Sequence, residues 1–290
     1  MFLRNLFQIY FAHHFQVVRQ CRILWRMIKK DGPLALSFRT YGNGPEALLA
    51  LHGYGQDHRA YEKFAAALSD RYTIYSFDLL LHGNSPGLPR PQALSRARWQ
   101  TMIKQFLRDQ AIDRFSLVGY SLGGRFALTL VETMAEQINH LILIAPDGIK
   151  SSRWYQFASG TWLGHWLLKK TVVNPLPFFR ITTAAQRLNL VEKSVLKFAE
   201  AHMDTRSKRF RVYARWVAFR QIQPNLPRVI QACNSHQLKV EIFVGKYDAI
   251  VKTKAIDNFR KALINSDIHT LPCGHNGLID EVGRFYASRP

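Results

Sequence analysis

The six residues from Gly119 to Gly124, Gly-Tyr-Ser-Leu-Gly-Gly, restrict the fold of this chain more than any other stretch. They follow the apolar run 115–118, which predicts a buried strand, and they precede residues 125–131, whose spacing predicts a helix. A serine between glycines at such a turn is held in a strained backbone conformation, with its hydroxyl above the sheet edge. The pattern therefore predicts an open α/β sheet and makes Ser121 a candidate nucleophile.

The chain has 290 residues, enough for one large α/β domain with an insertion, and its hydrophobic content of 47% supports a sizeable core. Three cysteines, Cys21, Cys233 and Cys273, lie far apart and lack Cys-x-x-Cys spacing. They predict neither a disulfide framework nor a zinc site, and they favour a reducing compartment. We therefore expect a cytoplasmic protein.

The formal net charge is +20, and the excess of cations is concentrated in two segments. Residues 1–30 carry six Lys/Arg and no Asp/Glu, and residues 151–223 carry thirteen Lys/Arg against three Asp/Glu. Such charge attracts nucleic acid, anionic membranes or acidic substrates. Because no motif that reads nucleic acid accompanies it, we expect no nucleic-acid partner.

Residues 1–30 form a basic, aromatic-rich arm with helical spacing. No apolar run in it reaches the ~18–20 residues needed to span a bilayer, and it lacks the small-residue cleavage site of a secretory signal. Such a helix either lies on an anionic membrane surface or packs on the body or on a partner subunit. Both interpretations stay open, so peripheral membrane association accompanies the cytoplasmic prediction.

Short apolar runs and helical spacings alternate through most of the remaining chain. Helices are predicted at residues 61–69, 92–110 and 253–263, and further strands at residues 34–41, 47–51, 72–77, 141–145, 240–244 and 267–271. Strands separated by helices predict a doubly wound, mainly parallel sheet with its site at the carboxyl ends of the strands.

Residues 151–223 interrupt this alternation with aromatic and basic residues at helical spacing, as at 162–170 and 194–203. We expect a helical cap over the site, inserted between the core segments 31–150 and 224–290. Its aromatics either form the core of the cap or line a pocket for an apolar group: Trp154, Tyr155, Phe157, Trp162, Trp166, Phe178 and Phe179.

Three chemically complementary side chains follow strands in the order Ser121, Asp248, His275. A serine hydroxyl needs an imidazole to take its proton, and the imidazole needs a carboxylate to hold its tautomer. By residue type alone, His52 or His82 can also serve as the base. Asp147 is the alternative acid, whereas Asp78 is interpreted as bracing its own loop.

Five motifs occur in the order that one family shows: His52-Gly53, Asp78 with residues 82–85, the serine turn 119–124, Gly245 with Asp248, and Gly274-His275. Over residues 34–150 and 224–290 the chain resembles the α/β-hydrolase fold family. That resemblance implies Ser121 as nucleophile, His275 as base and Asp248 as the orienting acid. It also implies an oxyanion hole formed by the backbone N–H groups of Tyr54 and Leu122.

The resemblance implies a serine hydrolase that cleaves a carboxylic ester or thioester, with an apolar acyl group favoured by the aromatic cap. The septet from Gly119 to Arg125 is also similar to one in the menaquinone-pathway synthase branch, a lyase, which makes Tyr120 and Arg125 candidate substrate-binding residues. Carbon–carbon bond hydrolases, a membrane-peripheral lipid hydrolase and a non-catalytic binding module remain alternatives. No cofactor or metal motif is found, and the sequence predicts no oligomeric state.

Overall fold

The computed structural model describes residues 35–88, 92–150, 153–187, 201–248, 250–251 and 253–289. The predicted arm at residues 1–30, and most of the helix predicted at 194–203, lie outside these residues. The described chain divides into two compact units. An α/β unit comprises the described residues of 32–86, 94–151 and 221–290, and a helical unit comprises those of 87–93 and 152–220.

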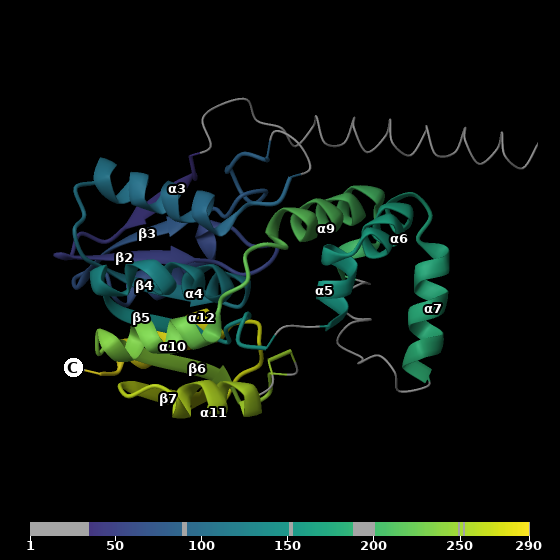
Figure 1. Cartoon of the computed structure of the whole chain (residues 1–290). Helices are drawn as coiled ribbons and strands as arrows, with labels where there is room; N and C mark the ends of the chain where they lie inside the picture. Colours follow the sequence, from purple (N-terminus) through teal and green to yellow (C-terminus); the bar gives the residue numbers. More distant parts are fainter. Residues whose placement is uncertain are drawn as a thin grey trace, which may run out of the picture. The chain divides into compact units, whose positions relative to one another are not determined.

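The α/β unit is built on a seven-stranded sheet with the order β1-β3-β2-β4-β5-β6-β7 (Figure 1). β1 pairs with β3 antiparallel, and every other neighbouring pair is parallel. The mainly parallel sheet predicted from the sequence is therefore confirmed. The strands are β1 (Phe38–Tyr41), β2 (Glu46–Leu51), β3 (Tyr72–Phe77), β4 (Phe115–Tyr120), β5 (Ile138–Ile144), β6 (Lys239–Gly245) and β7 (Ser266–Leu271).

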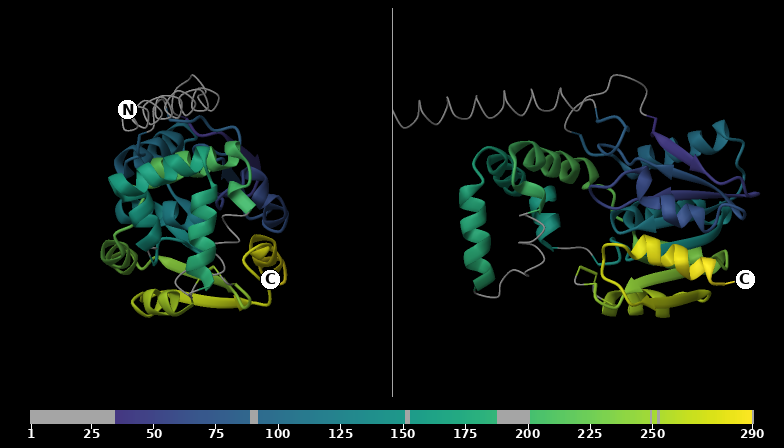
Figure 2. Two further views of the ribbon diagram at one scale, coloured as in Figure 1. Left: turned by 90° about the vertical axis from the view of Figure 1, so that its right-hand side faces the viewer. Right: turned by 180° about the vertical axis from the view of Figure 1, so that it is seen from behind.

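Helices cover both faces of this sheet. Figure 1 shows α3 (Arg96–Asp109), α4 (Leu122–Met134) and α10 (Leu226–Ser235) in front of it. The reverse view in Figure 2 brings α12 (Leu278–Ala287) to the front, where it packs against α2 (Glu62–Ala66). The remaining elements are the 3-10 helices η1 (His58–Tyr61) and η2 (Ala135–Gln137), and α11 (Thr253–Lys261).

Side chains of the central strands alternate between the two helical layers, as period-two strands require. One buried cluster joins strand residues to α2 and α12. It contains Leu48 and Ala50 of β2, Val118 and Tyr120 of β4, Ile142 and Ile144 of β5, Phe64 of α2, and Leu278 and Val282 of α12. The loops leaving the central strands are therefore anchored to a dry core.

Several element limits differ from those predicted. The first strand begins at Phe38, and the helix expected at 61–69 is a 3-10 turn followed by the five-residue α2. The helix α10 was not predicted, because the prolines at 224 and 227 suggested a break. Pro227 lies in the first helical turn, where its missing N–H costs nothing, and the Asn225 side chain accepts from Arg228 N–H at 3.3 Å.

The described part of the helical unit consists mainly of α5 (Arg153–Gly160), α6 (Trp162–Val173), α7 (Leu176–Arg187) and α9 (Arg206–Phe219). Buried Arg209 ties α6 to α9 by donating to the carbonyls of Val172, Met203 and Asp204 at 3.0–3.1 Å. The helical character predicted for this insertion is present in these residues. Its role as a cap stays a prediction.

A buried carboxylate, Glu241 of β6, lies among polar partners from its own strand and from neighbouring elements. Its Oε2 is 3.0 Å from His140 Nε2 and accepts from the Tyr286 hydroxyl, while Lys239 and His269 each approach Oε1 to 3.7 Å. Burial raises the pKa of Glu241, but hydrogen bonds from His140 and Tyr286 outweigh it and lower the pKa to about 2, from an ordinary 4.5.

This lowered pKa predicts an acid-dependent loss of stability. Because the folded-state pKa lies below the unfolded one, the stabilisation is complete above pH ~4.5 and disappears as the pH falls towards ~2. The contribution is at most about 3.5 kcal/mol. Urea unfolding from pH 7 to pH 2.5 should show this slope in wild type and a shallower one in Glu241→Gln. Identical slopes would contradict the assignment.

Candidate active site

The backbone at Ser121 has the strained geometry expected from the glycine-flanked turn. Its φ of 49° and ψ of −115° lie outside the regions that non-glycine residues usually occupy. Ser121 N–H donates to Ile144 O, and its carbonyl accepts from Gly124 and Asp147 N–H, each at 2.9 Å. These bonds hold the serine between the ends of β4 and β5 and the start of α4.

Glycines allow this turn to pack tightly. A Cβ on Gly123 would lie 1.9 Å from Leu51 O, and one on Gly119 would lie 2.7 Å from Gly123 O. Both separations are far inside van der Waals contact with rigid backbone. The helix α4 therefore starts directly against the end of β2, with its first N–H groups beside Ser121, where a helix N-terminus carries partial positive charge.

The structure brings together the three residues predicted to form a proton-transfer chain. His275 Nε2 lies 3.1 Å from Ser121 Oγ, and His275 Nδ1 lies 2.7 Å from Asp248 Oδ2. Ser121 follows β4, Asp248 follows β6 and His275 follows β7, so all three lie beyond the carboxyl ends of parallel strands. Nδ1–H donating to Asp248 leaves Nε2 to accept the serine proton.

The Asp248 carboxylate is nearly inaccessible, with its side chain 2% exposed. Burial raises its pKa, but the hydrogen bond and charge of His275 and the N–H groups of Ile250 and Val251 outweigh burial, so the pKa lies below the ordinary 3.8. Those two N–H groups bind Oδ1 at 2.7 and 3.1 Å and leave Oδ2 for His275. Asp248 is therefore ionised and oriented towards the imidazole at neutral pH.

Asp147, which is the alternative acid, and Asp78 have other partners. Asp147 Oδ2 accepts from the buried guanidinium of Arg125, and its Oδ1 accepts from Gly148 N–H at 2.7 Å. Asp78 Oδ1 accepts from His58 N–H at 2.7 Å, and its Oδ2 accepts from Asn84 N–H at 2.7 Å, so it braces its loop. The substrate-binding role of Arg125 stays a prediction; the structure shows its ion pair with Asp147.

Two buried histidines hold the loop that contains Tyr54. His52 Nδ1–H donates to Gly53 O at 2.7 Å while its Nε2 accepts from Leu79 N–H at 3.0 Å. His82 Nδ1–H donates to Leu80 O, and its Nε2 accepts from Gly55 N–H at 3.1 Å. With both ring nitrogens bonded to backbone, these imidazoles have structural partners rather than a serine.

The neighbours of Tyr54 on both sides are therefore fixed. Gly53 N–H donates to Gln56 Oε1 at 2.9 Å, and Gly55 N–H donates to His82 Nε2 at 3.1 Å. This arrangement orients the Tyr54 backbone in a rigid loop after β2, next to the strand that leads to Ser121. A rigid loop is what an oxyanion-binding N–H requires.

Tyr120, expected from the sequence to bind substrate, contacts His275 directly. Its hydroxyl donates to His275 O at 2.8 Å, and the two ring centroids are 5.1 Å apart. Its other side packs so closely on Gly53 that a Cβ there would lie 2.8 Å from the Tyr120 ring. Burial and the Asp248 charge raise the pKa of Tyr120 well above 10, which keeps this donor protonated. Nothing in the sequence signals this contact.

Tyr120→Phe is expected to lower kcat by about 3- to 10-fold and to leave KM nearly unchanged, because the lost hydrogen bond of ~1 kcal/mol holds the His275 loop rather than the substrate. Steady-state kinetics on a soluble ester measure the effects on kcat and KM separately. Tyr61→Phe is the matched control, since Tyr61 OH donates to Leu51 O at 3.0 Å without a hydrogen bond to His275. A raised KM with normal kcat would favour substrate binding instead.

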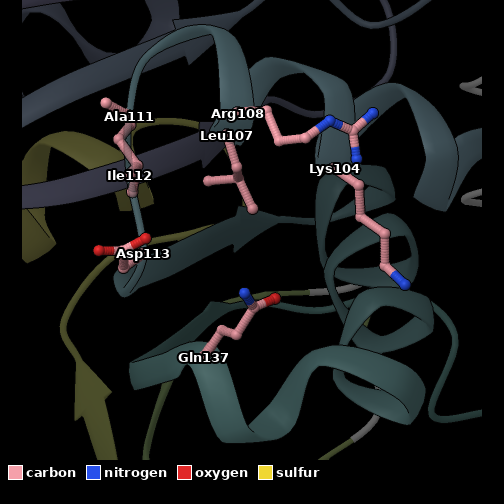
Figure 3. A pocket seen from close by; sticks show the side chains of 7 residues that line it. All are labelled: Lys104, Leu107, Arg108, Ala111, Ile112, Asp113 and Gln137. Atoms are coloured by element: carbon pink, nitrogen blue, oxygen red, sulfur yellow. The ribbon is translucent and has the colours of Figure 1, made fainter.

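Other polar features of the α/β unit lie away from this chain of hydrogen bonds. A surface hollow of about 530 Å³ (Figure 3) is lined by Lys104, Leu107, Arg108, Ala111, Ile112, Asp113 and Gln137. Residues 111–113 and 137 precede β4 and β5, so the hollow lies at the opposite, amino-terminal edge of these strands.

Among the described residues, one group of side chains has metal-ligand spacing: Asp57, His58 and Asp78. The Asp57 carboxylate is paired with Arg59 at 2.6 Å, and Asp78 Oδ1 accepts from His58 N–H and lies 2.9 Å from its Nδ1. These bonds explain why the three side chains lie close together: they brace the loop after β3. In the part of the chain described here, no helix is both long and apolar enough to cross a bilayer.

Comparisons with known proteins identify the fold family of this chain. The family model described as alpha/beta hydrolase fold matches residues 46–282. A pimeloyl-[acyl-carrier protein] methyl ester esterase of Nitrosomonas europaea is 30% identical over 122 residues, which are 41% of this chain and 45% of that protein. A human (lyso)-N-acylphosphatidylethanolamine lipase is 32% identical over 108 residues, which are 37% of this chain and 32% of that protein.

Among solved structures, an esterase from Thermogutta terrifontis superposes with a TM-score of 0.63 at 16% identity, covering 87% of this chain and 90% of the other. At this identity the likeness concerns the fold. The sequence matches to the curated relatives described above span less than half of their lengths.

Proposed function

This chain belongs to the α/β-hydrolase fold family, and we propose that it hydrolyses a carboxylic ester or thioester through an acyl-enzyme formed on Ser121. The observation that carries the proposal is the continuous hydrogen-bonded chain from Ser121 Oγ through His275 to Asp248. Relatives named as an esterase and a lipase support hydrolase activity in general.

In the proposed first step, Ser121 Oγ attacks the acyl carbonyl while His275 Nε2 takes its proton. The negative charge that develops on the carbonyl oxygen is bound by the N–H groups of Leu122 and Tyr54. His275 then gives its proton to the departing alcohol or thiol, and the acyl group stays on Ser121. Asp248 holds the imidazole orientation and stabilises its positive charge throughout.

In the second step, His275 takes a proton from water, which attacks the acyl-enzyme carbonyl. The oxyanion donors act again, and the carboxylic acid leaves as Ser121 regains its proton from His275. Both half-reactions use one base and one pair of donors, so a single constellation serves formation and breakdown of the intermediate. No metal or cofactor is required by this sequence of steps.

An apolar acyl group is the proposed substrate class. The insertion at 151–223 is rich in aromatic residues, and a relative acts, by its name, on the methyl ester of a carrier-bound pimeloyl chain. The lyase alternative is less favoured, because the guanidinium of Arg125 is buried against Asp147. That pairing gives the arginine of the septet a structural partner.

A fluorophosphonate probe tests the proposal, because it reacts covalently with activated serines. Wild type is expected to be labelled stoichiometrically and Ser121→Ala to remain unlabelled. Turnover of matched esters and thioesters with acyl chains of 2 to 16 carbons then defines the substrate class. Equal labelling of both proteins, or no labelling of wild type, would favour a non-catalytic binding module.

A further inference from the structure

The helix α6 exposes an apolar face in addition to the one it buries. Gly164, Leu168, Thr171 and Val172 form its buried side. The opposite side carries Trp162, which is 80% exposed, with Leu163 at 45% and Leu167 at 44%, and with half-buried Trp166 between them. At 100° per residue, positions 162, 163, 166, 167 and 170 fall on one arc of the helix.

A helix that is apolar on both sides normally has cover on both sides. Isolated apolar residues on a surface need no explanation, but two tryptophans and two leucines on one face form a patch of the kind that marks an interaction site. Tryptophan suits a boundary between oil and water, because its ring is apolar while its N–H donates a hydrogen bond. The chemistry of the face therefore indicates an amphipathic partner.

Charge identifies which partner fits. The described residues of the helical unit, 153–187 and 201–220, contain eleven Lys/Arg and a single acidic residue, Asp204. On the exposed face itself, Lys170 places its ammonium 3.9 Å from the centre of the Trp166 ring. Tryptophan and leucine bordered by cations is the composition of a helix that lies in an anionic membrane interface.

We propose that the exposed face of α6, formed by Trp162, Leu163, Trp166, Leu167 and Lys170, docks on an anionic phospholipid surface. A second copy of this chain fits less well, because the same strongly cationic unit would be placed against itself and repelled. Docking is independent of the chemistry at Ser121. It also differs from anchoring by residues 1–30, because the side chains that enter the lipid belong to the insertion.

The test uses the full chain and extruded vesicles of phosphatidylcholine, alone or with 30% phosphatidylglycerol, at 0.1 M salt. The variant Trp162→Ser/Leu163→Ser/Leu167→Ser removes the apolar face at side chains that are already exposed. The single variant Trp162→Ser is the milder change to α6. Ile264→Ser is the matched control, because Ile264 is 76% exposed in the α/β unit. Thermal unfolding checks that each variant is folded.

Wild type is expected to partition onto the anionic vesicles, and the triple variant to partition about 10- to 100-fold less, while Ile264→Ser behaves as wild type. Lipids brominated in the acyl chains should quench tryptophan fluorescence in wild type and less in Trp162→Ser. An unchanged partition coefficient in the triple variant would overturn the proposal. So would a wild-type dimer that the triple variant makes monomeric without any wild-type binding to vesicles.

Discussion

Asp248→Asn is expected to lower kcat/KM on a soluble ester by about 10,000-fold, the loss that follows when the orienting carboxylate of a serine triad becomes an amide. The amide can donate to His275 Nδ1, which stabilises the wrong imidazole tautomer and leaves Nε2 protonated towards Ser121. Stopped-assay rates with p-nitrophenyl butyrate, normalised to folded protein, measure the effect.

Asp147→Asn is the matched control for this substitution. Asp147 also follows a central strand, but its carboxylate pairs with Arg125, and His275 bonds to Asp248 instead. We expect its kcat/KM to fall by less than about 10-fold, as befits loss of a partly exposed ion pair near the turn. A larger loss in Asp147→Asn than in Asp248→Asn would reverse the assignment of the acid.

Gly123→Ala is expected to destabilise the α/β unit by at least about 4 kcal/mol, or to prevent folding. The added methyl would lie 1.9 Å from Leu51 O and 2.8 Å from His52 O, both backbone atoms of the strand end that α4 abuts. Relief requires that α4 move away from β2, which would also displace Leu122 from Ser121. Urea unfolding monitored by circular dichroism measures the loss.

Gly160→Ala serves as the control for a glycine-to-alanine change. Gly160 is the last residue of α5, and a Cβ there meets no atom within 4 Å. We expect a change between zero and a stabilisation of about 1 kcal/mol, because alanine is the better helix former. Full stability in Gly123→Ala would show that the turn relaxes more readily than its contacts indicate.

The fold was largely predictable because its strands are short, apolar and separated by helices. The runs at 72–77 and 240–244 reappear as β3 and, one residue longer at each end, as β6. Predictions of helices and strands were wrong or missing where the local sequence pattern and the tertiary packing differ. The helix α12 (Leu278–Ala287) was not predicted, because its N-cap Gly277, with a φ of 85°, offers no side-chain cap and the usual start signal is absent.

Ser121, Asp248 and His275 were predictable by type and order, whereas the contacts of Tyr120 and Arg125 were not. Ser121, Asp248 and His275 follow strands that a parallel sheet brings to one edge, so motif order was sufficient to group them. The pairing of Arg125 with Asp147, and of Tyr120 with His275, depends on side-chain directions across 22 and 155 residues of sequence. No periodicity or motif encodes such directions.

The position of β7 at the edge of the sheet predicts that denaturant abolishes activity before it unfolds the α/β unit. This strand pairs with β6 alone, none of its residues is fully buried, and it leads directly to the loop carrying His275. Terminal strands of this kind open locally at a lower free energy than the whole domain. In mild denaturant, activity should therefore vanish before the helical signal changes, and dilution should restore it without refolding of the centre.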